Sequence, residues 1–498
     1  MKMGAKAKRK ASVPPKPAES KLAGFGRAPA AYAAASAAVL IPCFWQARIQ
    51  AGDLGSHVYN AWLAQLIAKG QAPGLGVMGQ TTNVVFDLLL GWLLRAFGPA
   101  AAQRIAVSLA VLVFFWGAFA FVAAVSRRPW PVAPVLAALA YGWVFHMGFF
   151  NFYLSLGLCF WALALVWNSP ARSRWPAAAA LLALAYAAHG LPLVWAAGVL
   201  AYYRMWRGLG GRARAYLLGG SVAAVVLLRA AIVAKLPTRW FTAQIWRTTG
   251  ADQLWVFGDK YTLLAGALVA VWVWMAASGR ENAATDSTTA RALGPIAILT
   301  AAGIFLIPNG IWIPGYSHQL AYIAQRMSLP LGVVICGWVA ARCAAGRSRL
   351  WQAGAMGLIA LLFFGFLYSD EEVLNDFEDQ VDQVVAQLPP GQRVVLSVDD
   401  DDIQVNALTH MIDRACIGRC WSYANYEPSS GQFRVRVVGE TSVVAATDMD
   451  SSGMQVGSYV VKPRDLPLVQ IMVNNAGRLV VRQPPAGSPI GITRWSGL

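Results

Sequence analysis

An aspartate and a histidine stand one helical turn apart, directly after the first long apolar run of the chain. They are Asp53 and His57, in the sequence Gly52-Asp53-Leu54-Gly55-Ser56-His57. Residues four apart share one face of a helix, so this carboxylate and this imidazole can act together on one bound molecule. A carboxylate so placed can serve as a general base, and the histidine can hydrogen-bond it, hold a metal ion with it, or contact an anionic substrate. The alternative is that Asp53 only caps the helix and His57 only anchors it at a membrane interface.

The composition indicates a membrane protein with several spans. The 498 residues are 57% hydrophobic and only 13% charged, and the mean hydropathy is +0.48. These values lie outside the range of soluble globular proteins. The net charge of +17 is unevenly distributed, because residues 370–498 hold 10 Lys and Arg against 17 Asp and Glu. The two parts therefore face different surroundings, and nucleic acid is not the expected partner.

The N-terminal 29 residues hold eight Lys and Arg against one Glu, which predicts a basic cytoplasmic tail beside anionic membrane lipids. The apolar run at 30–49 is long enough to span and lacks a signal-peptide cleavage site, so it predicts a retained anchor. Ten further apolar runs bring the expected number of transmembrane helices to about eleven. Those at 175–188 and 191–206 form either two helices or one broken hairpin. The runs are 104–125, 131–147, 150–167, 175–188, 191–206, 215–234, 261–277, 293–308, 327–344 and 350–368.

The positive-inside rule favours a cytoplasmic N-terminus, because most Lys and Arg before residue 370 then fall on cytoplasmic connections. The expected fold is an α-helical polytopic protein of the inner (plasma) membrane. Its transmembrane domain covers 30–369, and a small α/β or mostly β domain at 370–498 lies outside, in the periplasm of a Gram-negative cell. All five histidines then lie on the outer side, as do Asp53 and Asp87. Protonatable chemistry is therefore expected at the outer face.

The first outer connection, 50–103, contains two amphipathic stretches at 57–69 and 84–97, which predict helices lying in the membrane interface. The order of a basic tail, one span, this loop with its early aspartate, about ten more spans and an outer domain resembles the GT-C superfamily of integral-membrane glycosyltransferases. The resemblance in residues is confined to Gly52-Asp53-Leu54-x-x-His57 and the turn Gly70-Gln71-Ala72-Pro73.

The resemblance implies transfer of a hexose or pentose at the outer leaflet from a polyprenyl-phosphate donor. Asp53 would be the general base of an inverting reaction, and Asp87 would bind the acceptor or share a divalent metal with Asp53 and His57. Arg326, from a late outer loop, would bind the donor phosphate, for which a guanidinium is well suited. The alternatives are a solvated position for Asp87 and simple snorkelling of Arg326 to the interface.

Other outer residues are weaker candidates for substrate binding. Each histidine can also be a satisfied helix-end residue, and each basic residue an interface anchor. The remaining candidates are His146, His189, Arg239, Arg247, Lys260 and His318.

Two features mark the C-terminal domain. Cys416 and Cys420 would lie in an oxidising compartment, which predicts a disulfide, whereas a zinc site lacks a second ligand pair. The acidic run at 399–402 lacks the spacing of a calcium loop. Strands are expected at 394–398, 433–438, 442–446, 457–462, 468–473 and 478–482.

The sequence therefore favours a membrane glycosyltransferase with Asp53 as base. A lipid or glycan flippase would instead predict internal repeats and charged residues within the spans, which are scarce here. A non-catalytic anchor that presents the outer domain is the third hypothesis. The sugar, the acceptor, the oligomeric state and the role of the outer domain are not indicated.

Overall fold

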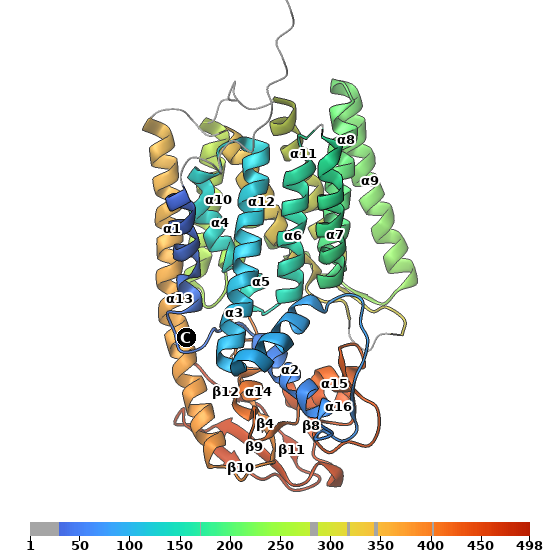
Figure 1. Cartoon of the computed structure of the whole chain (residues 1–498), viewed down its shortest axis with the longest axis vertical. Coiled ribbons are helices and arrows are strands. Elements are labelled where there is room, and N and C mark those ends of the chain that lie inside the picture. Colours follow the sequence, from blue (N-terminus) through green and yellow to red (C-terminus); the bar gives the residue numbers. More distant parts are fainter. Residues whose placement is uncertain (1–28, 170, 279–286, 316–318, 343–346, 401–402) are drawn as a thin grey trace, which may run out of the picture. The chain divides into compact units, whose positions relative to one another are not determined.

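The computed structural model describes residues 29–169, 171–278, 287–315, 319–342, 347–400 and 403–498. The chain divides into two compact units, Met1–Ala38 and Val39–Leu498. In the first unit the structure describes only the start of helix α1 (Pro29–Leu40). Apart from α1, the elements discussed below belong to the second unit. Figure 1 labels many of them.

The described residues are mostly helical, and five of their helices are long and apolar enough to cross a membrane. They are α3, α9, α10, α12 and α13, and they indicate a multi-pass membrane protein. Shorter apolar helices lie at Pro29–Cys43, Phe150–Val166 and Ala290–Leu306. The α-helices are α1 (Pro29–Leu40), α2 (Leu54–Ala68), α3 (Val85–Ser126), α4 (Ala133–Ala140), α5 (Trp143–His146), α6 (Phe150–Val166), α7 (Trp175–Ala188), α8 (Gly190–Arg207), α9 (Gly211–Lys235), α10 (Lys260–Ser278), α11 (Ser287–Leu306), α12 (Ile323–Arg342), α13 (Arg347–Gln387), α14 (Met411–Cys416), α15 (Tyr426–Ser430) and α16 (Asp448–Gln455).

The apolar run at 131–147 is not one helix, contrary to the prediction. It forms α4 and the single turn α5, separated at Gly142, whose backbone is extended. A Cβ on Gly142 would lie 2.8 Å from the carbonyl oxygen of Gln253, so the break allows a close backbone approach. The runs at 175–188 and 191–206 also form two helices. His189 is extended between α7 and α8, and its Nδ1 accepts the N–H of Leu191 as an N-cap.

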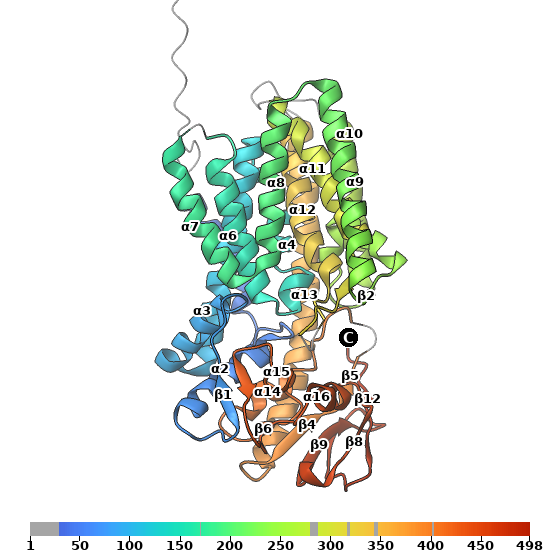
Figure 2. The same cartoon turned by 90° about the vertical axis from the view of Figure 1, so that its right-hand side faces the viewer.

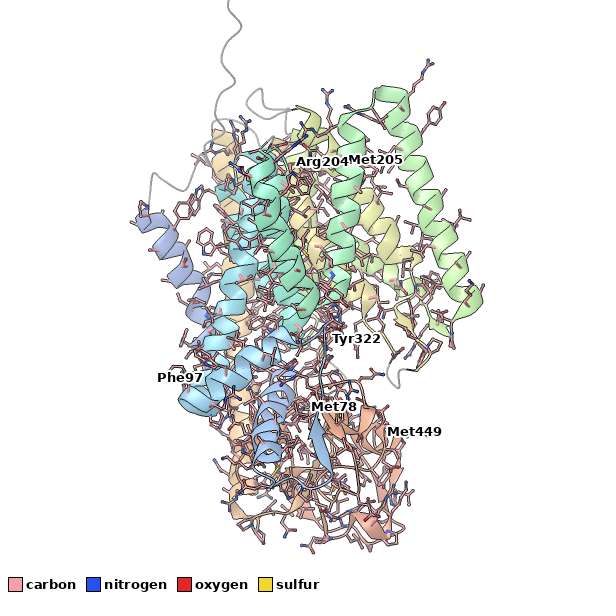
Figure 3. The ribbon with its side chains drawn as sticks, turned by 45° about the vertical axis from the view of Figure 1, so that its right-hand side comes forward. Met78, Phe97, Arg204, Met205, Tyr322 and Met449 are labelled. Atoms are coloured by element: carbon pink, nitrogen blue, oxygen red, sulfur yellow. A yellow bond between two sulfur atoms is a disulfide. The ribbon has the colours of Figure 1, made fainter. Side chains whose placement is uncertain are left out.

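The second amphipathic stretch of the connection at 50–103 forms a helix of its own, as predicted. Gly98, with a φ of 77°, and Pro99 interrupt α3. Proline has no N–H to donate, and glycine accepts the left-handed conformation, so the chain turns between the two halves. Trp92 and Phe97 in the first half are each 57% exposed, and Figure 3 shows the Phe97 side chain at the margin of the molecule. Such aromatic residues suit the membrane interface.

Helix α13 carries the chain from the apolar helices into the C-terminal region without a break (Figure 2). The helix therefore continues through residue 370, where the sequence suggests a domain boundary. The polar C-terminal half of α13 contacts the segment before α2. The contacting side chains of α13 are three or four residues apart and so lie on one face of the helix. Trp45 Nε1 donates to Glu371 at 2.6 Å, the Arg48 N–H to Asn375 at 2.7 Å, and Gln50 Nε2 to Glu378 at 2.9 Å.

The C-terminal region contains a four-stranded sheet in the order β10-β9-β4-β6. Its central strand β9 is almost fully buried, in keeping with an apolar run that is covered on both faces. Expected strands appear at β4, β5, β7, β8, β9 and β10, whereas residues 442–446 form bends and irregular backbone instead. The strands are β1 (Leu75–Val77), β2 (Thr238–Arg239), β3 (Gly310–Ile311), β4 (Arg393–Leu396), β5 (Val398–Asp399), β6 (Trp421–Ser422), β7 (Val435–Val437), β8 (Tyr459–Val460), β9 (Leu468–Val473), β10 (Leu479–Arg482), β11 (Pro489–Ile490) and β12 (Thr493–Arg494).

Strand pairing and side-chain contacts join the connection at 50–103 to the C-terminal region. β1 pairs antiparallel with β7, with Leu75 opposite Val437. The Tyr59 hydroxyl of α2 accepts the Ser422 N–H at 3.0 Å, and Trp62 packs on Trp421 with ring centroids 5.9 Å apart. The connection is thus part of the C-terminal fold as well as of the membrane part.

A buried ion pair at α13 provides a test of this arrangement. Arg414 donates from Nε and Nη2 to the two carboxylate oxygens of Glu378, at 2.8 and 2.7 Å, and Glu378 is fully buried. Glu378→Gln leaves the arginine without its charge partner and should cost about 3 kcal/mol, visible as a lower melting temperature in detergent. Glu372→Gln, on the exposed face of the same helix, is the matched control and should change little. Equal melting temperatures for the two variants would contradict a stabilising role for the Arg414–Glu378 ion pair.

Candidate functional site

The backbone at Asp53 is held by close contacts with the turn that follows α5. The Gly52 N–H donates to the His146 carbonyl at 2.7 Å, and the Asp53 N–H donates to the Met147 carbonyl at 3.0 Å. Gly148 has a φ of 80°, and a Cβ there would lie 2.5 Å from the Asp53 nitrogen. Only glycine fits so close an approach in that conformation. The start of α2 is therefore fixed against the membrane helices.

The Asp53 side chain does not cap α2, although Asp53 is the residue at the N-cap position. Its carboxylate points instead toward the C-terminal region, with Oδ1 3.7 Å from Nε2 of His410, and it remains 18% exposed. The helix-cap alternative is therefore wrong, and the carboxylate is partly open to a bound molecule.

His57 bonds to Asp87 in the structure. Its Nδ1 lies 2.7 Å from Asp87 Oδ1, so the first half of α3 meets α2 at this pair. Asp87 Oδ2 accepts Asn151 Nδ2 at 3.0 Å, and Asn151 Oδ1 accepts the Phe86 N–H at 2.9 Å. Asp87 is thus a bonded member of the cluster, and a fully solvated position for it is ruled out. Asn151 was not predicted, because nothing in its sequence surroundings distinguishes it from other residues of an apolar run.

Carboxylates around His57 favour its charged form. Burial alone would lower the pKa of His57, but the charge and hydrogen bond of Asp87, with the charges of Glu427 and Asp53, raise it to about 9. Burial raises the pKa of Glu427 to about 7, against the opposing effect of His57. The neighbouring carboxylates thus favour the charged form of His57, and burial favours the protonated form of Glu427.

The C-terminal region contributes residues that sequence reasoning did not place at the site. The Ser56 hydroxyl donates to Glu427 at 2.9 Å, and Asn60 and Asn425 are joined by a hydrogen bond of 2.9 Å. Their only sequence signal was the density of Tyr, Trp, Asn and Glu around residue 425. That pattern equally suits a small domain's core.

Arg326 and His189 form a second polar cluster, next to the aromatic ring of Phe149. The Arg326 guanidinium lies 3.8 Å from that ring centroid, and its Nη1 lies 3.4 Å from His189 Nε2. His189 Nδ1 already accepts the Leu191 N–H, and burial followed by the charge of Arg326 lowers the pKa of His189 to about 3. The neutral ring must then carry its proton on Nε2, so two donors face each other without an acceptor.

No carboxylate of the described residues lies within 4.0 Å of the Arg326 guanidinium, and its Nε is buried without a partner. Asp53 and Tyr426 are nevertheless close enough to interact with it electrostatically. A group with negatively charged oxygens would satisfy the unpaired donors of this cluster.

The other predicted binding residues have different surroundings or lie outside the described residues, and neither ring nitrogen of His146 makes a hydrogen bond to a described residue. His146 is fully buried, 3.5 Å from Glu371 and stacked on Phe257. Arg247 pairs with Asp252 at 3.5 Å, and Lys260 pairs with Asp370. Arg239 is exposed over the ring of Phe241. His318 is one of the residues that the structure does not describe.

Metal ligation by Asp53, His57 and Asp87 gains no support from the geometry. The parts of the chain that the structure covers contain no group of three or more His, Cys, Asp or Glu side chains arranged to hold a metal ion. Cys416 and Cys420 form a disulfide at the end of α14, with the Cα atoms 4.5 Å apart.

Comparison with known proteins identified no homologue: no family model, no curated protein and no solved structure matches this chain.

The pKa of His57 predicts a dependence of stability on pH. Because the folded value of about 9 exceeds the ordinary 6.5, its proton stabilises the fold fully below about pH 6.5, and this contribution is lost as the pH rises through about 9. The melting temperature of the wild type should therefore fall more between about pH 7 and pH 10 than that of His57→Gln. Asp259→Asn, an exposed acid of another connection, is the control and should show the same pH dependence as the wild type. Parallel melting curves for wild type and His57→Gln would refute the charged His57.

Proposed function

We propose that this protein is a membrane glycosyltransferase of GT-C type, which transfers a sugar from a polyprenyl phosphate to a hydroxyl acceptor. One observation carries the proposal: a partly exposed carboxylate, Asp53, lies within electrostatic reach of an arginine, Arg326, that lacks an acidic partner among the described residues. A base and an anion-binding group that lie this close are what displacement of a phosphate by a hydroxyl requires.

Asp53 is the general base in this proposal. The acceptor hydroxyl gives its proton to Asp53, its oxygen bonds to the anomeric carbon, and the bond from that carbon to the phosphate oxygen breaks. A single displacement of this kind inverts the anomeric configuration. The fixed backbone of Asp53 supports the role, since a base must hold its position relative to the reacting atoms.

Arg326 and the Nε2–H of His189 bind the leaving phosphate in this proposal. The negative charge that develops on the phosphate oxygen would meet two donors that are already oriented. The ring of Phe149 under the guanidinium provides an apolar wall, which suits a donor that carries a polyprenyl chain.

The proposal retains the membrane topology that the sequence predicts. It places the N-terminus in the cytoplasm, about eleven membrane segments in the apolar part, and Asp53 and the C-terminal region on the outer side. The exposed Trp92 and Phe97 of the interfacial half of α3 support a position near the headgroups, where a lipid-linked donor would enter.

Asp53→Asn should reduce transfer at least about a hundredfold, because the amide cannot accept the proton. The assay follows release of radiolabelled hexose or pentose from a panel of polyprenyl-phosphate sugars, in proteoliposomes supplemented with membranes of a strain that lacks the protein. Asp259→Asn, an exposed acid of another connection, is the matched control. Full transfer by Asp53→Asn at unchanged melting temperature would end the proposal that Asp53 is the base.

Arg326→Gln should weaken binding of a short-chain polyprenyl phosphate by about tenfold to a hundredfold, since a charge-assisted hydrogen-bond pair is lost. Arg326→Lys should bind with intermediate affinity, because it keeps the charge but loses the forked geometry. The exposed Arg478→Gln is the control. Native mass spectrometry or thermophoresis of the detergent-purified protein measures the affinities, and equal affinities for wild type and Arg326→Gln would exclude the assigned phosphate site.

A further inference from the structure

His410 connects the C-terminal region to Asp53 through both of its ring nitrogens. Nδ1 lies 2.8 Å from Asp413 Oδ2, and Nε2 lies 3.7 Å from Asp53 Oδ1. Asp413 is anchored in turn by the hydroxyl of Ser422, which donates to its second carboxylate oxygen. His410 and Asp413 are almost completely buried, whereas Asp53 is partly exposed. The chain of contacts thus leads from the interior of the C-terminal region to the open carboxylate.

Glycines on both sides of Asp53 bring this segment close. A Cβ on Gly55 would lie 2.1 Å from the carbonyl oxygen of His410, and a Cβ on Gly52 would lie 2.9 Å from that of Asn406. Real Cβ atoms do not approach an oxygen so closely, so any side chain at Gly55 would displace His410 from Asp53. The contact between the two side chains therefore depends on backbone packing as well as on charge.

The charges around His410 also point to Asp53. Burial would lower the pKa of His410, but its hydrogen bond to Asp413, the charge of Asp413 and the charges of Asp53 and Glu427 raise it. Tyr426 of α15 faces the same ring at 5.9 Å between centroids. An imidazole whose Nδ1 is held by a buried carboxylate has a fixed orientation, so its Nε2 is directed at one target. That target is Asp53.

We propose that His410, oriented by Asp413, is a positioning residue for Asp53, so that the C-terminal region completes the reacting centre. This inference rests on the proposed role of Asp53 as base. Nε2 of His410 faces Oδ1 of Asp53 at 3.7 Å, and electrostatic attraction between them orients the carboxylate so that Oδ2 accepts the proton of the acceptor hydroxyl. The C-terminal region is then a part of the enzyme's active site and more than an appendage outside the membrane.

A titration that needs no substrate tests the coupling. The full-length protein, labelled with ¹³C-histidine and reconstituted in nanodiscs, is titrated by NMR, and the His410 signal is identified by its loss in His410→Gln. Asp53→Asn should lower the midpoint of His410 by about one pH unit, since a neighbouring negative charge is removed. Asp259→Asn should leave it unchanged. An unchanged His410 midpoint in Asp53→Asn would overturn the proposal.

Kinetics separate this inference from the proposed function. His410→Ala should lower kcat at least about tenfold with little change in KM, and His410→Gln should recover most of the loss, because the glutamine amide can donate to Asp53 in place of Nε2. In an Asp53→Asn background, His410→Ala should have no further effect, since the histidine acts through the aspartate. Transfer that survives Asp53→Asn defeats the proposed function. Transfer that requires Asp53 but is unaffected by His410→Ala defeats the positioning role alone.

Discussion

The close approach of three backbone segments at Asp53 is the constraint on which the site depends. Gly148 meets the Asp53 backbone from the α5–α6 turn, and Gly52 and Gly55 meet the segment before α14. Because none of these glycines carries a Cβ, α2 can lie against both the membrane helices and the C-terminal region at once. A side chain at any of the three positions would separate elements that must meet for Asp53 to reach its neighbours.

This packing explains how several ionisable groups can be buried together. Buried charges are costly unless they are paired, and here the partners come mostly from different elements, although His410 and Asp413 lie three residues apart at the start of α14. His57 of α2 meets Asp87 of α3, His410 meets Asp413 and Asp53, and Ser56 donates to Glu427. Arg326 differs, since none of the described carboxylates lies within hydrogen-bonding distance of it and its nearest neighbour is another donor. A site with one unpaired cation beside satisfied pairs is suited to bind an anion.

Local sequence patterns predicted part of this arrangement. They could not predict contacts between residues that lie far apart in the sequence. Amphipathic spacing was enough to predict a separate helix at 84–97, and the position of Asp53 after the first apolar run singled this residue out. The pairing of His57 with Asp87 rather than Asp53 depends on how α2 and α3 cross, which periodicity does not determine. His410 lies more than 350 residues from Asp53 in the chain, so no spacing rule connects them. The break at Gly142 was not predicted, because hydrophobicity alone does not show that a residue within an apolar run is extended. The close approach of the Gln253 backbone, which favours the break, is a contact between distant residues.

Two different kinds of surroundings meet at Asp53, and this division favours a donor and an acceptor of different chemistry. Arg326, His189 and Phe149 come from the helical, apolar part of the chain and combine a cationic and a neutral donor with an aromatic wall. His410, Glu427 and Asn425 come from the C-terminal region and are polar. β1–β7 pairing and the unbroken α13 hold the two parts together, so neither can leave the site without breaking regular structure. A lipid phosphate suits the first surroundings and a hydroxyl-bearing acceptor the second, with the carboxylate that would transfer the proton between them.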